Sequence, residues 1–350
     1  MNREIVMPFI AAIILGVGLL TIASVAHDPG IMQKQLLGVA TATLPIALLL
    51  ALGRQRLYAL AVPLYMGALF LLALTMVAGT EVNGNRNWLG HGFFQFQPLE
   101  FGKIALILML AKYMREPIRG LRDYIPVALV SLPMIALVAT EDFGGTLVLF
   151  MVILGMMVVR GLPVRHLILG LVLISVAVPT VIFPHLKPYQ QDRLTIFLNP
   201  ARDPLGQGYQ VIQSTIAIGS GGLTGKGYGE GTQSQLGFVP EVHTDFIFAP
   251  WSEEQGFIGA LFLLFMFLGL FWRLASMGGE CPSETDRLVV GGVMSMLGFQ
   301  VLENIGSAIG LAPVTGLTLP LVSYGVTSVI SVTLSLAVVY VIHRDRYREF

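Results

Sequence analysis

The sequence has few charged residues and almost no cysteine. Of its 350 residues, 12% are charged, and Cys281 is the single cysteine. Soluble domains carry about 25% charged residues, so this composition excludes an ordinary soluble enzyme and a disordered chain. One thiol excludes a disulfide framework and a cysteine-based metal centre. The 21 basic residues equal the 21 acidic ones, so no net field recruits a polyanion, and a nucleic-acid partner is excluded.

Long apolar windows dominate what is present. A bilayer is crossed by about 20 apolar residues, and windows of this kind predict an all-α polytopic membrane protein with ten transmembrane helices. Residues 1–350 are then a single membrane domain. Two windows hold charges, Glu100 and Lys103 in the fourth and Glu303 in the ninth. The predicted spans are Ile5–Ala26, Gln35–Gly53, Leu57–Thr80, Pro98–Met114, Tyr124–Thr140, Phe143–Val159, Leu167–Phe183, Gln255–Trp272, Leu288–Leu311 and Val322–Ile342.

The lysines and arginines predict the orientation of these spans. Fourteen of the 21 fall on the side that holds Arg54 and Arg122, and seven fall on the other side. Cytoplasmic loops are the richer in lysine and arginine, so both termini are expected in the cytoplasm. The long polar stretch 184–250, between spans seven and eight, is then a large extracytoplasmic loop.

The acidic residues indicate where chemistry would occur. Thirteen of the 21 fall on the extracytoplasmic side, whereas the cytoplasmic loops are short and contain no phosphate-binding loop. ATP and nucleotide sugars are not found outside the cytoplasm. An enzyme working there needs a substrate that carries its own activation.

The large loop has helical and glycine-rich parts. Apolar residues at helical spacing, around Leu194–Leu198 and Tyr209–Ile216, predict short amphipathic helices on the membrane surface. Glycines crowd 219–229 around Lys226. Such a segment allows the backbone to approach a ligand closely, or it serves as a flexible connector; both interpretations are open.

The end of this loop carries His243 and Asp245 in an increasingly apolar run. Desolvation raises the pKa of a carboxyl and makes it a better base. The alternative is that Asp245 caps the next helix. Glu253 and its neighbour Glu254 are expected to be solvated acids of that helix's first turn, and Pro250 is expected to kink it.

Other polar residues sit in or near the spans. Glu100 and Lys103 share one helix face and predict an ion pair, either functional or a latch between helices. Arg86 and Trp88 belong to a run of amides that suits a sugar or a diphosphate, although Trp88 also fits an interfacial belt. Asp142 is a candidate helix cap, and Glu303 with Asn304 are candidates for bonds to a neighbouring helix.

Several long motifs stand out: Gln97-Pro-Leu-Glu-Phe-Gly-Lys103, Asp203-Pro-Leu-Gly-Gln-Gly-Tyr-Gln-Val-Ile-Gln-Ser214, Gly231-Thr-Gln-Ser-Gln-Leu236, Pro240-Glu-Val-His-Thr-Asp-Phe-Ile-Phe248 and Leu319-Pro-Leu-Val-Ser-Tyr-Gly325. With these motifs the sequence resembles the SEDS family (shape, elongation, division and sporulation), and its elongation member more than its division member. The resemblance extends over nearly the whole chain.

This resemblance implies a ten-span peptidoglycan glycosyltransferase of the bacterial cytoplasmic membrane. It would polymerise lipid II at the extracytoplasmic face during cell elongation, with Asp245 as general base. Implied partners are a class B penicillin-binding protein and the elongation machinery. A divalent cation, Mg²⁺ or Mn²⁺, fits a diphosphate leaving group, but the sequence shows no site for it. The substrate-binding candidates are Arg86, Trp88, Glu100, Lys103, Asp142, Arg193, Arg202, Lys226, His243 and Ser323.

Two other functions fit a polytopic protein of this composition. A lipid II flippase would need polar residues across the full membrane depth. A non-catalytic scaffold for the penicillin-binding protein would need no base. The charges at the extracytoplasmic ends of the spans favour the polymerase.

Overall fold

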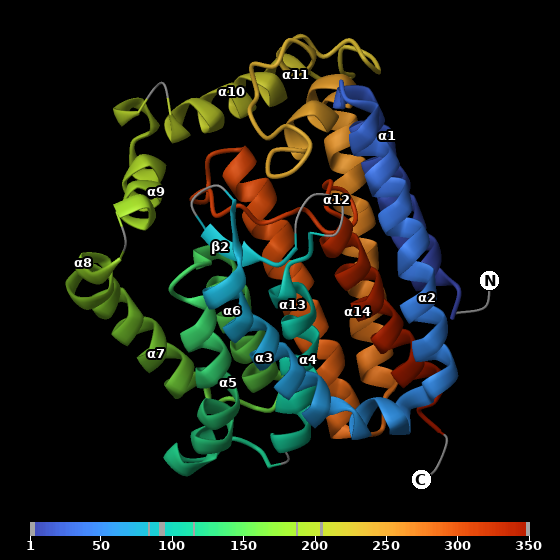
Figure 1. Ribbon diagram of the computed structural model, residues 1–350, viewed down its shortest axis with the longest axis vertical. Helices are drawn as coiled ribbons and strands as arrows, with labels where there is room; N and C mark the ends of the chain where they lie inside the picture. Colours follow the sequence, from blue (N-terminus) through green and yellow to red (C-terminus); the bar gives the residue numbers. More distant parts are fainter. Residues whose placement is uncertain are drawn as a thin grey trace.

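The computed structural model describes residues 4–82, 85–90, 95–114, 116–186, 188–203 and 206–347. It is a bundle of long helices with one two-stranded antiparallel hairpin (Figure 1). The membrane-type helices are α1 (Val6–Val25), α2 (Pro29–Ala59), α3 (Ala61–Ala78), α4 (Pro98–Tyr113), α5 (Tyr124–Val138), α6 (Phe143–Val159), α7 (Val164–Ala177), α12 (Phe248–Glu280), α13 (Glu284–Ala308) and α14 (Val326–Arg344). The other elements are β1 (Thr80–Val82), β2 (Asn85–Trp88), α8 (Phe183–His185), α9 (Pro188–Leu198), α10 (Gln207–Ser220), α11 (Thr232–Gln235) and the short helical turns η2 (Leu121–Asp123), η3 (Val178–Ile182) and η4 (Pro200–Arg202).

Each predicted span coincides with one of the membrane-type helices. Seven are long and apolar enough to cross a membrane, and α5 and α6 are shorter apolar helices. The 16-residue α4 carries Glu100 and Lys103. An all-α polytopic membrane protein is therefore confirmed, whereas the count of ten crossings stays a prediction.

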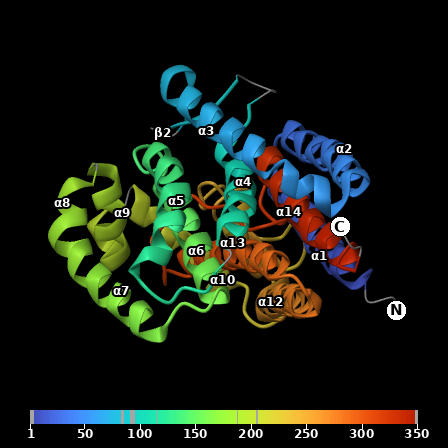
Figure 2. The same ribbon diagram turned by 90° about the horizontal axis from the view of Figure 1, so that it is seen from below.

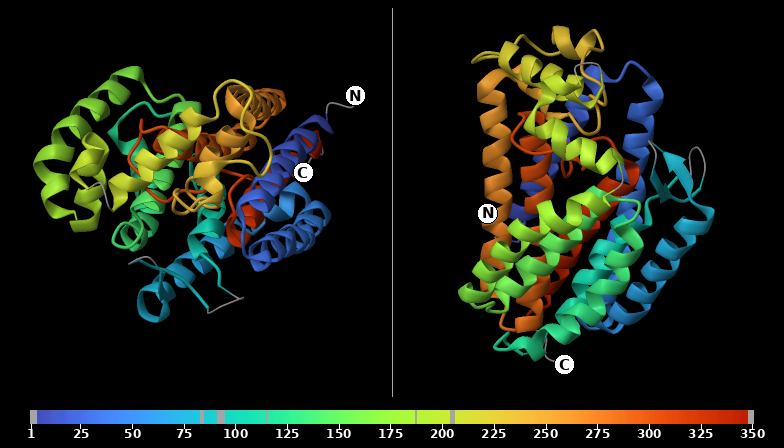
Figure 3. Two further views of the ribbon diagram at one scale, coloured as in Figure 1. Left: turned by 90° about the horizontal axis from the view of Figure 1, so that it is seen from above. Right: turned by 90° about the vertical axis from the view of Figure 1, so that its left-hand side faces the viewer.

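The ends of the helices form two separate groups. The first, called here the loop end, lies beneath α10 and α11 (Figures 1 and 3). There the Gln235 amide donates to the carbonyl of Ser24 (2.9 Å), which ties α11 to the end of α1. At the far end, Arg54 pairs with Asp286 (2.8 Å) and Arg160 with Glu284 (3.1 Å).

The centre of the bundle is made by α4, α13 and α14, which are buried along most of their length. By contrast, α7 stands to one side with α8 and α9, and none of the residues of α7 is buried (Figure 2). Helix α7 therefore presents apolar side chains on all sides, as expected of a helix surrounded by lipid.

Two long helices break at glycine. Gly53 in α2 and Gly256 in α12 have φ of 73° and 66°, in the left-handed region that glycine adopts freely. The expected kink at Pro250 is wrong. This proline lies in the first turn of α12, where its missing N–H would have no helical partner in any case.

Candidate active site

Asp245 lies just before α12, on a segment fixed to the bundle by its backbone. Helix α12 begins at Phe248 with no side-chain cap, so the interpretation of Asp245 as a helix cap is wrong. The Asn304 amide of α13 donates to the carbonyl of Asp245 (2.8 Å). The Ser323 hydroxyl donates to the carbonyl of Thr244 (2.6 Å). Both bonds engage backbone carbonyls and not the Asp245 carboxyl group.

The segment between α13 and α14, residues 309–325, forms the opposite wall. Asn304 also donates to the carbonyl of Leu317 (2.8 Å), so one amide ties both segments together. A side chain at Gly316 would come within 3.6 Å of the Asp245 carboxyl oxygen Oδ2, which places that carboxyl against a bare backbone position. At this position the wall presents backbone, not a side chain, to the acid.

Left-handed backbone marks both walls. Among the described residues, the two non-glycine residues with positive φ are Glu241 (48°) and Leu321 (66°). Such conformations cost of the order of 1–3 kcal/mol each and persist where the surroundings enforce them, often at functional sites. One lies on the Asp245 segment and the other on the opposite wall.

The electrostatics suit a base at neutral pH. Burial, followed by the negative charge of Glu241, raises the pKa of Asp245 to about 7, while Arg193 acts in the opposite direction. Burial also lowers the pKa of His243, whose ring packs edge-on against Tyr324 (5.5 Å between centroids). Asp245 can therefore hold or release a proton near pH 7, and the imidazole of His243, two residues earlier in the chain, is neutral there.

Arg193 and Glu303 meet at Thr315 of the opposite wall. Arg193 reaches in from α9 and donates to the Thr315 carbonyl (2.8 Å). Glu303 Oε1 accepts from the Thr315 N–H (3.1 Å) and from its hydroxyl. Its second oxygen, Oε2, is buried and has no hydrogen-bond partner among the described residues. The expectation that Glu303 and Asn304 bond a neighbouring helix is corrected: both hold loop backbone.

A second polar cluster surrounds Asp142 at the start of α6. Its carboxylate caps that helix by accepting from Gly145 N–H (2.6 Å), as the sequence indicated. Amides of Asn87 (3.2 Å) and Gln97 (3.0 Å) donate to the other oxygen. A side chain at Gly144 would meet the Thr315 carbonyl at 2.8 Å, so this cluster adjoins the same wall as Asp245.

The predicted ion pair of α4 is confirmed. Lys103 Nζ lies 2.8 Å from Glu100 Oε1, and the two residues are 2% and 7% exposed. The Ser331 hydroxyl of α14 donates to the Glu100 carbonyl (2.8 Å). This bond ties the turn of α4 that carries the pair to α14 in the centre of the bundle.

The remaining predicted site residues are spread more widely. Arg86 is exposed and lines a small cavity of about 10 Å³ with Asn87 and Asp142. Trp88 is half-buried in the hairpin, and Arg202 is exposed after α9. The Ser323 hydroxyl accepts from Leu319 N–H (2.8 Å) besides donating to Thr244, so it serves the backbone of the two walls.

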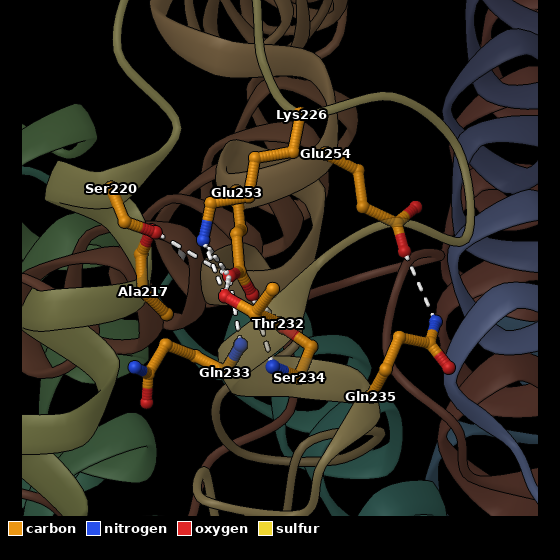
Figure 4. Close-up of polar contacts among 9 residues, drawn as sticks. All are labelled: Ala217, Ser220, Lys226, Thr232, Gln233, Ser234, Gln235, Glu253 and Glu254. Atoms are coloured by element: carbon orange, nitrogen blue, oxygen red, sulfur yellow. Dashed lines mark hydrogen bonds and ion pairs between the residues drawn. The ribbon is translucent and has the colours of Figure 1, made fainter.

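Lys226 belongs to a different cluster, centred on Glu253 (Figure 4). Its ammonium lies 2.7 Å from Glu253 Oε1 and 2.7 Å from the Thr232 hydroxyl. The expectation that Glu253 is a solvated acid is wrong, because its side chain is fully buried. Sequence reasoning missed this cluster, since the only local signal was a pair of acids in an otherwise apolar helix.

No three His, Cys, Asp or Glu side chains gather into a metal site within the part of the chain that the structure describes. The oxygen ligands that Mg²⁺ or Mn²⁺ would need are therefore not assembled by those residues alone.

Comparison with known proteins identifies the family to which the chain belongs. A family model described as "Cell cycle protein", covering FtsW, RodA and SpoVE, matches residues 4–348. The chain belongs to the FtsW, RodA and SpoVE family. Within it, the peptidoglycan glycosyltransferase MrdB of Escherichia coli K12 is 37% identical over 324 residues, covering 91% of this chain and 87% of MrdB.

Solved structures of the family share the whole fold. A structure of a peptidoglycan synthase complex, concerned with coordination of polymerization and crosslinking, has a chain that is 45% identical with a TM-score of 0.87. The rod shape determining protein RodA of Thermus thermophilus is 38% identical with a TM-score of 0.76. These matches cover 98% of this chain and 98% and 97% of theirs, so the fold of the family is this chain's fold.

Proposed function

We propose that this protein polymerises lipid II into glycan strands at the extracytoplasmic face of the bacterial cytoplasmic membrane, with Asp245 as the general base. The observation that carries the proposal is the Asp245 carboxyl, aimed at a bare backbone position between two pinned segments, with a pKa near 7. A base near the working pH transfers protons most effectively.

In the proposed reaction, Asp245 takes the proton from the acceptor GlcNAc hydroxyl as that oxygen attacks the anomeric carbon of the donor sugar. The bond from that carbon to the donor's diphosphate breaks, and the lipid diphosphate leaves with the electron pair. Attack opposite the leaving group inverts the α-linked donor to a β-linked product. Because a diphosphate leaves without being protonated, a single carboxyl suffices.

Cations on the same side of the bundle would stabilise the leaving group. Arg193 enters the Asp245 side of the site, Arg86 is exposed on the Asp142 side, and Arg202 is exposed after α9. Guanidinium groups recognise phosphate oxygens in a bidentate manner. We propose that the diphosphate binds beside these arginines. We also propose that Asp142, Trp88 and the Glu100–Lys103 pair line the site that holds the sugar.

We also propose a class B penicillin-binding protein as partner and the elongation machinery as the setting. This proposal is supported by the similar chain in a peptidoglycan synthase complex, whose structure concerns the coordination of polymerization and crosslinking. A flippase is less well supported. Charged residues of the described helices lie toward their two ends, and no charged path crosses between them.

The test is polymerisation of labelled lipid II by purified Asp245→Asn protein, alone and with a class B penicillin-binding protein. Asn keeps the shape but cannot take the proton, so the rate should fall 10²–10⁴-fold. The exposed Glu230→Gln, in the same loop, is the matched control and should polymerise normally. Near-normal glycan chains from the Asn variant would remove Asp245 from the reaction, whereas a non-catalytic scaffold predicts no glycan chains from the purified parent protein either.

Folding of the variant can be checked independently. The raised pKa means that the folded state holds the Asp245 proton more tightly than the unfolded state does. This group's contribution to stability is therefore present at low pH and is lost as pH rises toward about 7. At pH 8 the Asn variant should unfold at the same temperature as the parent or above it, so lost activity cannot be ascribed to unfolding.

A further inference from the structure

Glu253 is a fully buried carboxylate whose hydrogen bonds of 3.0 Å or less come from α11 and from Lys226. Its Oε1 accepts from the Gln233 N–H (2.9 Å) and the Lys226 ammonium (2.7 Å). Its Oε2 accepts from the N–H (3.0 Å) and the hydroxyl (2.6 Å) of Ser234 (Figure 4). A buried charge satisfied so completely holds its partners firmly, because removing it leaves buried donors unpaired.

These partners make Glu253 a closure point in the chain. Gln233 and Ser234 belong to α11, and Glu253 belongs to the second turn of α12. The carboxylate therefore joins the two ends of the segment 233–253 into a ring. Asp245 lies inside this ring, on the stretch between α11 and α12. Closing a loop reduces the number of conformations that its residues can adopt.

The α12 side of the ring is held by backbone hydrogen bonds to a neighbouring segment. The glycine-rich segment 219–229 lies directly against the break in α12, where the backbone N–H of Lys226 donates to the carbonyl of Glu253 (3.1 Å). In return, Phe257 N–H donates to the Gly222 carbonyl (2.9 Å). A side chain at Gly225 would come within 2.1 Å of the Glu254 carbonyl oxygen. The glycines thus permit contact between two backbones, which was neither of the roles expected for them.

We propose that Glu253 is a positioning residue for Asp245: its carboxylate closes the ring 233–253 and so fixes where the base stands. The proposal rests on the proposed function. The two pinned carbonyls of Thr244 and Asp245 fix the segment on its bundle side, and Glu253 fixes it on its outer side. Loss of this closure should let the segment move outward and admit water, without unfolding the bundle.

The experiment compares Glu253→Gln with the parent in lipid II polymerisation across pH. Gln has the same size, but its NH₂ group faces N–H donors and cannot accept from them. We expect kcat to fall about 10–100-fold, with KM changed less than about twofold, because misplacement of a catalytic group by about 1 Å costs up to 10²-fold. The acid limb of the pH profile should also move to lower pH, since water around Asp245 favours its charged form.

This pH shift separates positioning from general loosening. The charged groups that act on Asp245 are Glu241, Arg193 and Glu303, and all are unchanged in Glu253→Gln. The matched control is Ser214→Ala, which removes a buried bond from α10 to the Ala308 carbonyl (2.8 Å) outside the ring. It should leave the midpoint of the acid limb in place.

Equal effects of Glu253→Gln and Ser214→Ala, or an unchanged kcat and pH profile in Glu253→Gln, would overturn the proposal. If Glu253→Gln protein is not recovered folded, Ser234→Ala is measured instead. It should shift the profile in the same direction by a smaller amount, and no shift would equally overturn the proposal. Asp245→Asn is measured in parallel. If Asp245→Asn is inactive and Glu253→Gln is normal, the positioning role of Glu253 is overturned and the proposed function stands. If Asp245→Asn is active, the proposed function itself is overturned.

Discussion

The Glu100–Lys103 pair offers the clearest residue-scale test of how the site is held together. Each partner is buried, so losing one leaves an uncompensated charge at a cost of about 3–5 kcal/mol. Glu100→Gln and Lys103→Met should each lower stability by that order. The double variant should lose less than the sum of the two. Denaturation of the four proteins in one detergent gives the coupling energy, and strictly additive losses would mean that the two side chains do not interact in the membrane.

The pH dependence of polymerisation reports on Asp245 directly. A base acts in its deprotonated form, so the rate should rise as pH increases through about 7 and level off above it. Glu241→Gln removes the nearby negative charge that contributes to the raised pKa. Its acid limb should move to lower pH by less than about one unit, while Glu230→Gln should not move it. A profile in Glu241→Gln that coincides with the parent's would show that this charge does not reach the base.

At the scale of elements, the break in α12 at Gly256 is the most demanding piece of geometry. An added Cβ would lie 2.3 Å from the Gly225 backbone nitrogen, and φ is 66°. Gly256→Ala should therefore destabilise the protein by at least about 1–3 kcal/mol from backbone strain alone. Gly279→Ala, in the same helix with nothing within 4 Å of the new methyl group, should be neutral or stabilising. Thermal unfolding distinguishes them, and equal melting temperatures would mean that the glycine-rich segment does not pack there.

Comparison of these elements with the sequence shows what local patterns can predict. Apolar windows located the membrane-type helices, because crossing a bilayer demands length and hydropathy that can be read residue by residue. The amphipathic spacing around Tyr209–Ile216 likewise predicted α10. The Glu100–Lys103 pair followed from helix geometry alone.

Contacts between distant segments escaped this kind of reasoning. The burial of Glu253 depends on α11 folding back over the start of α12, which no local pattern encodes. The break at Gly256 was missed for the same reason, since it exists to admit the backbone of 219–229. The sequence pointed to Asp245 as a candidate base and located the helix that follows it, whereas the two walls that hold its segment could not be predicted.

At the scale of the whole molecule, the orientation of the bundle is the prediction to test first. One set of hydrogen bonds ties the helices together at the loop end, and a separate set of ion pairs ties them at the far end. The count of lysines and arginines assigns the far end to the cytoplasm. Reporter fusions after Arg122 and after Gln207 should therefore report opposite sides of the membrane. Equal signals from the two fusions would contradict the ten-crossing map.

The charges of the described helices gather toward these two ends and leave the middle of the bundle uncharged. Residues 104–111 of α4, 255–272 of α12 and 288–302 of α13 contain no ionisable group. A membrane voltage of 100 mV exerts about 2.3 kcal/mol on each elementary charge that crosses it. Because these three stretches carry no ionisable group, a change in membrane voltage exerts no such force on them.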